Sequence, residues 1–192
     1  GIVSIEVSAG GGAGIVSSTI LAGVLGAGAD MVFGTMDDTF VAGASIGSLD
    51  ADLVENSTIL SGAIGAITVS GGAVTGSMFR ALQPGGPGMG EINVQTVASE
   101  TVVSAISGSR FESASNIAAI AASLSGDRPL SGETAVIRDS TFASGDYMGP
   151  VDVSSLMATE YYNPSAVGIE NSAFYAGVAG LEGGIGGIAV WV

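Results

Sequence analysis

Residues 137–144 read Ile-Arg-Asp-Ser-Thr-Phe-Ala-Ser, and this eight-residue pattern recurs through the chain. Its seven copies occupy residues 15–22, 35–42, 54–61, 74–81, 106–113, 137–144 and 169–176. Position one is β-branched, position three is Asn, Asp, Gly or Ser, position six is Phe or Ile, and position eight is Ala or Ser. Position four is Ser in six copies and Asp38 in the copy at 35–42. Recurrence at this period indicates supersecondary units that stack on one another.

The pattern is typical of a bend followed by a short strand. In a strand, positions four, six and eight face one side and positions five and seven face the other. Asn, Asp or Gly at position three suits a tight bend with positive φ. Because stacked strands lie about 4.8 Å apart, the side chains at position six should form one internal column. Its predicted members are Ile20, Phe40, Ile59, Phe79, Phe111, Phe142 and Phe174.

The spacing of the copies predicts the architecture. Successive copies begin 19 or 20 residues apart in the first half of the chain and 31 or 32 apart in the second. Two or three short strands joined by turns fit both lengths. We therefore expect an all-β chain, a single-stranded parallel β-helix (β-solenoid) of about seven rungs over residues 15–192. Residues 1–14 would then form an N-terminal cap or donor strand.

A helical alternative exists for two stretches. Residues 115–125 and 40–54 can be drawn as Ala-rich helices packed on a sheet. Frequent Gly and β-branched residues argue against long helices in both places.

Three copies resemble the bend-plus-strand signature of right-handed parallel β-helix proteins. They read Glu-Asn-Ser-Thr-Ile at 55–59, Arg-Asp-Ser-Thr-Phe at 138–142 and Glu-Asn-Ser-Ala-Phe at 170–174. Pectate-lyase-like proteins and autotransporter passengers stack similar rungs, and the resemblance covers roughly residues 15–192. It implies the architecture and the handedness of the coil. It does not imply a function, because this fold carries enzymes, adhesins, spikes and stalks.

Composition narrows the location and the partners. Of 192 residues, 47% are hydrophobic but only 6% are aromatic, and the formal net charge is −14. This charge repels nucleic acid and anionic membrane surfaces, and no apolar run is long enough to span a bilayer. Residue 1 is Gly and no signal peptide is present, so we expect either a processed, exported protein or an excised segment. An extracellular or cell-surface location suits the acidic charge.

The side-chain chemistry does not predict an enzyme. The chain has no His, Cys or Lys, so a serine nucleophile lacks a base. We expect no catalytic residue and no cofactor, although glycosidase chemistry by carboxylates alone stays open. Asp37, Asp38, Asp50 and Asp52 are candidates for a calcium site, since hard cations bind clustered oxygens. The alternative is that they are turn and surface acids.

Two surfaces are predicted to make contacts. Positions five and seven of the first three copies form a strip of Thr and aliphatic residues, namely Thr19, Leu21, Thr39, Val41, Thr58 and Leu60. This strip should be covered by a second subunit or by this chain. The alternatives are that it is simply exposed, or that it binds ice, as ordered Thr arrays do in some solenoids. The segments 1–9 and 185–192 are apolar and suit strand addition, unless each folds over its own core. The assembly candidates are Ile2, Val3, Ile5, Val7, Ile188, Val190, Trp191 and Val192.

Together these features predict an extracellular structural protein, a filament or surface-array subunit that polymerises through its ends. The alternative is an adhesin, or a carbohydrate-binding or carbohydrate-active module of a larger exported protein, with polysaccharide as its partner.

Overall fold

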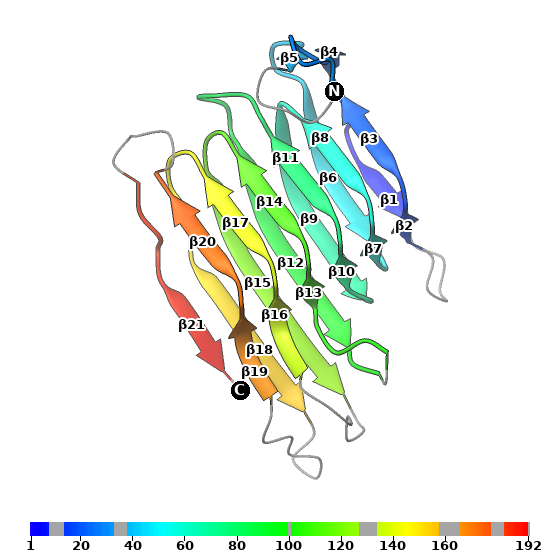
Figure 1. Ribbon diagram of the computed structural model, residues 1–192, viewed down its shortest axis with the longest axis vertical. Coiled ribbons are helices and arrows are strands. Elements are labelled where there is room, and N and C mark those ends of the chain that lie inside the picture. The colour runs from blue at the N-terminus through cyan, green and yellow to red at the C-terminus, as the bar shows by residue number, and fades with distance from the viewer. Residues whose placement is uncertain are drawn as a thin grey trace.

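A computed structural model describes residues 1–7, 14–32, 38–99, 101–126, 134–157, 166–177 and 183–191. These residues form an all-β structure with three long parallel sheets and no helix (Figure 1). The helical alternative is therefore wrong. Strand β15 (Ile117–Gly126) occupies most of the first stretch, and β6 (Ser45–Ala51) lies within the second.

Sheet A contains seven parallel strands, and sheets B and C contain six each. The order of sheet A is β1 (Ile5–Val7), β6, β9 (Ala63–Gly71), β12 (Met89–Val97), β15, β18 (Val151–Met157) and β21 (Ile188–Trp191). Sheet B runs β2 (Ile15–Val16), β7 (Val54–Glu55), β10 (Val74–Thr75), β13 (Ile106–Ser107), β16 (Thr134–Arg138) and β19 (Ala166–Glu170). Sheet C runs β3 (Thr19–Ala22), β8 (Thr58–Ser61), β11 (Met78–Ala81), β14 (Arg110–Ser113), β17 (Thr141–Ser144) and β20 (Ala173–Ala176).

The chain visits sheets A, B and C in turn and then returns to sheet A one strand further on. We call one such set of three strands a level. The levels succeed one another from β1–β3 at one end to β18–β20 at the other, and β21 adds a further strand to sheet A (Figure 1). Six complete levels are therefore described, and the topology is compatible with a parallel β-helix.

All three sheets contribute side chains to one core. Fully buried residues include Leu49 of sheet A, Val54 of sheet B and Ile59 of sheet C. Within sheet C, strand register places the side chains of position six directly above one another. This column contains Ile20, Ile59, Phe79, Phe111, Phe142 and Phe174. Its four rings stack at centroid distances of 4.7, 4.9 and 4.9 Å, which match the spacing of adjacent strands.

Phe40 does not belong to this column, which corrects the sequence prediction. It lies on β5 (Thr39–Phe40), which pairs antiparallel with β4 (Val24–Gly26). Strand β3 instead pairs directly with β8. The described residues of this copy, 38–42, thus lie between β3 and β6 in the chain and add no strand to the three sheets.

The bend at position three has the predicted backbone conformation. In the six copies that form levels, φ at this position lies between 45° and 58°. The residues are Ser17, Asn56, Gly76, Gly108, Asp139 and Asn171. Asn, Asp and Gly are the residues that adopt left-handed backbone at least cost, which explains their frequency here.

The serine at position four links the levels by hydrogen bonds. Its backbone N–H donates to the Oγ of the equivalent serine one level further on, at 3.1–3.2 Å, along the series Ser18, Ser57, Ser77, Ser109, Ser140 and Ser172. Each serine Oγ in turn donates to the backbone carbonyl two residues earlier, within its own level, at 2.7–3.0 Å. We call this series the serine ladder. A carboxylate at position four could accept the N–H of the preceding level but could not donate to that carbonyl, so Asp cannot make both hydrogen bonds that the serine makes.

The predicted strip of Thr and aliphatic residues is exposed to solvent at only some of its positions. Leu60 is fully buried, so this chain covers that part of the strip. Leu21 and Val41 remain partly exposed. Thr39 belongs to the β4–β5 pair and not to sheet C, so the three copies do not form one continuous strip.

Candidate functional site

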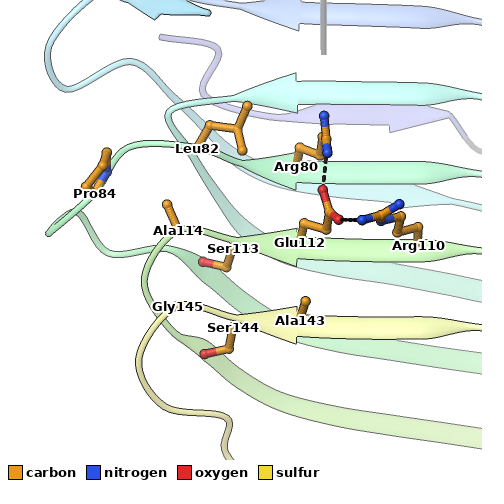
Figure 2. A pocket seen from close by; sticks show the side chains of 10 residues that line it. All are labelled: Arg80, Leu82, Pro84, Arg110, Glu112, Ser113, Ala114, Ala143, Ser144 and Gly145. Carbon is orange, nitrogen blue, oxygen red and sulfur yellow. Dashed lines mark hydrogen bonds and ion pairs between the residues drawn. The ribbon is translucent and has the colours of Figure 1, made fainter. Parts of the chain in front are cut away.

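A pocket of about 310 Å³ lies on the outer side of sheet C, beside the turns that follow β11, β14 and β17 (Figure 2). Strand residues form one wall and turn residues form the other. The lining residues are Arg80, Leu82, Pro84, Arg110, Glu112, Ser113, Ala114, Ala143, Ser144 and Gly145. The pocket lining as a whole is mostly apolar, and one side of it carries a group of charged side chains.

The charged group consists of one carboxylate between two guanidinium groups. Glu112 accepts a hydrogen bond from Nε of Arg80 on the neighbouring strand and forms an ion pair with Nη2 of Arg110 on its own strand (Figure 2). The side chains of Arg80 and Glu112 are 13% and 15% exposed, whereas that of Arg110 is 54% exposed. The group carries one net positive charge in a chain of net charge −14.

This arrangement supplies groups that can recognise a ligand. Among the described residues, Glu112 is the only acid that lines the pocket, and two Arg side chains already hold it. Glycosidases of the usual type need two carboxyl groups flanking the scissile bond. The exposed guanidinium of Arg110 can donate to an anionic group or to hydroxyl oxygens.

A second ion pair joins two levels in sheet B. Nε of Arg138 donates to Oε2 of Glu170 at 2.6 Å. Neither of these two interlevel ion pairs was predicted from the sequence. The signal was present, because Arg80 and Glu112 both occupy position seven of their copies and Arg138 and Glu170 both occupy position two. Opposite charges at one position of successive copies must lie opposite each other once the copies stack.

The calcium candidates do not form one cluster, although Asp50 lies directly opposite Glu6 of β1. Asp37 lies outside the described residues. Asp38 is buried just before β5. Asp50 lies near the end of β6, where it accepts a hydrogen bond from Ser48, and Asp52 directly follows that strand. Among the residues that the structure describes, no three acidic side chains are grouped closely enough to hold a metal ion.

The edges of the sheets form the second candidate site. Strands β1, β2 and β3 lie at one end of the stack, and β21, β19 and β20 lie at the other. Val3 and Trp191 are 88% and 70% exposed, and Ile188 and Val190 are about half exposed. Ile2, Ile5 and Val7 pack partly against the core. Val192 lies outside the described residues.

The comparisons with known proteins identify no relative. No family model and no curated protein sequence matches the chain, and no solved structure matches it. What the structure defines is the class, an all-β protein of three parallel sheets. The described part of the chain contains no helix that is long and apolar enough to cross a membrane.

Proposed function

We propose that the protein is a parallel β-helix that serves as an extracellular structural subunit and assembles end to end into a filament or surface array. The observation that carries this proposal is the pair of open ends. Neither β3 nor β20 has a second neighbour among the described strands of sheet C. An edge strand presents unpaired N–H and C=O groups, which are a template for another chain.

The residues at these ends favour contact with a second copy. Exposed apolar side chains lie on both outermost levels, including Val16 and Leu21 at one end and Tyr175 and Trp191 at the other. The net charge of −14 opposes association at low ionic strength. Since salt screens this repulsion over distances of about 10 Å at 0.1 M, assembly should strengthen as salt is added, as suits a protein outside the cell in saline water.

Light scattering and negative-stain microscopy at increasing protein and salt concentration test this proposal. We expect assemblies that lengthen with both variables. Leu21→Pro should shorten them without lowering the melting temperature, because proline removes an N–H from an edge strand and is tolerated there. Leu21→Ala is the matched control, since it keeps the N–H and should still assemble. Monomers of the unsubstituted chain under all conditions would exclude the proposal.

The pocket supports a second candidate function, which is ligand binding as a carbohydrate-binding or adhesin module. Sugar hydroxyls could accept hydrogen bonds from Arg110 over an apolar floor. None of the described aromatic residues lines the pocket, although aromatic rings supply much of the contact area in many binding sites. A glycan-array screen of the protein and of Arg110→Ala tests this candidate, and binding that is lost in the variant would support it.

A further inference from the structure

The number of described strands does not allow two copies to stack by simple contact. Sheet A has one more strand than sheets B and C. If a second copy pairs its β2 with β19 and its β3 with β20, its β1 falls on the position already held by β21. If its β1 pairs with β21 instead, sheets B and C each lack one strand, and the edges there stay about 9.6 Å apart, twice the strand spacing.

We propose that β21 of one copy replaces β1 of the next copy, so that assembly proceeds by strand displacement. This inference rests on the end-to-end assembly proposed above and specifies its contact. After displacement, β21 pairs with β18 of its own copy on one side and with β6 of the next copy on the other. Sheets B and C then close as well, and all three sheets continue from copy to copy.

The inward side chains of β1 and β21 are identical at equivalent positions. Register through sheet A relates Ile5 to Ile188 by way of Leu49, Ile67, Ile92, Ile120 and Val151. The neighbouring columns relate Ile2 to Ile185 and Val7 to Val190 in the same way. The segments 2–7 and 185–190 therefore carry Ile, Ile and Val at the same three places of the register, so either segment can fill the position beside β6.

Outward-facing charges favour β21 in that position. Glu6 of β1 lies directly opposite Asp50 of β6. Ala189 is the residue of β21 at the equivalent place, so the exchange removes a like-charge pair between adjacent strands, which is destabilising. The reverse exchange, in which β1 pairs with β18, would place Glu6 opposite Asp152 and keep the repulsion.

The remaining contacts also match. Continuing the register of sheet C places Phe174 against Ile20 of the next copy and Tyr175 against Leu21. The serine ladder continues too. No described residue accepts a hydrogen bond from the N–H of Ser172, and no described N–H donates to the Oγ of Ser18. Joining the two ends brings that donor to that acceptor.

Three double-cysteine variants of the full chain test the displacement, because the chain has no cysteine of its own. Directly paired strands bring Cα atoms within disulfide range, whereas a gap of one strand does not. Leu21→Cys/Tyr175→Cys reports closure of sheet C, and Asp50→Cys/Ala189→Cys reports β21 beside β6 of another copy. Glu6→Cys/Ala189→Cys reports the direct contact of β1 with β21. Within one copy, the first two pairs are five levels apart.

After oxidation of assembled protein, we expect the first two variants to lose the monomer band on a non-reducing gel and to regain it with reductant, while the third stays monomeric. Crosslinking of the third variant without the first would overturn the displacement in favour of simple stacking. Closure of sheet C without an Asp50–Ala189 crosslink would overturn β21 as the bridging strand. If no variant crosslinks while light scattering still detects assemblies, the displacement is wrong and the proposed function stands. If the unsubstituted chain never assembles, both fail.

Discussion

Two copies of the same eight-residue pattern, at 137–144 and at 35–42, fold differently. The first supplies a bend with positive φ at Asp139, a place in the serine ladder at Ser140 and a ring in the column at Phe142. The second places Phe40 in an antiparallel pair outside the three sheets. The two copies share the Phe and the small residue at position eight, so the inward apolar side chains alone do not build a level. Within the pattern, the two copies differ at position four, where Asp38 replaces serine.

The largest expected effect comes from removing a ring from the column. Phe142→Ala should lower the free energy of unfolding by about 3–5 kcal/mol, because the side chain is fully buried between two other rings. Phe40→Ala should cost about 1 kcal/mol or less, since Phe40 is only partly buried and lies outside the core cluster. Denaturant unfolding of both variants measures the contrast. Equal losses would contradict the assignment of Phe40 to a peripheral pair.

An Asp in the serine ladder, as at position four of the copy at 35–42, should lower the free energy of unfolding by nearly as much. Ser109→Asp should cost about 3 kcal/mol, because a buried carboxylate cannot donate to the carbonyl of Ser107 and is left close to it. Ser107→Asp is the matched control. That position lies opposite Arg138 in the register of sheet B, so the same change there should be neutral. Thermal melting compares the two variants, and similar losses in both would show that the ladder is not the sensitive site.

Replacing the bend residue at position three should reduce stability by an intermediate amount. Asn56 has a φ of 48°, and Ala in left-handed backbone costs about 1–2 kcal/mol. Asn56→Ala should therefore lower the melting temperature, while Asn56→Gly should leave it nearly unchanged, since Gly76 and Gly108 hold the equivalent bends. A loss in the Gly variant equal to that in the Ala variant would instead assign the effect to the Asn side chain.

The smallest effect is expected for the ion pair at position two. Glu170→Gln should cost about 0.5–1 kcal/mol at low salt, because both partners are partly exposed. Since salt screens such pairs, the difference from the unsubstituted chain should shrink in 1 M NaCl. A difference that does not change with salt would indicate that packing of the side chain, and not its charge, is responsible.

Local chemistry made much of the fold predictable from the sequence. Bend residues such as Asn56 carry their φ preference in their covalent structure, and the spacing of Phe79, Phe111 and Phe142 fixes their alignment once strands stack. The β4–β5 pair was not predictable in the same way, because the copy at 35–42 matches the pattern at its apolar positions. It departs from the pattern only at position four, and the hydrogen bonds that the serine makes there become visible only in the structure.

The candidate sites could be predicted from the sequence only by comparing equivalent positions in different copies of the pattern. Opposed charges such as Arg80 and Glu112 lie 32 residues apart, and nothing local links them. Their pairing follows only from comparing the same position in successive copies. The pocket also needed the structure, since turn residues such as Pro84 and Gly145 meet there from different levels. The apolar character of the end strands was evident from the sequence, but their identical register required the pairing of every strand in sheet A.

The serine ladder gives the whole stack a polarity. Every backbone N–H in it points toward the C-terminal end and every acceptor Oγ belongs to the following level. The two faces of the stack are therefore chemically unlike, with a donor on one and an acceptor on the other. Two molecules meeting with like faces would oppose donor to donor or acceptor to acceptor. A polymer built on this contact would have distinguishable ends, and subunits would point the same way along its entire length.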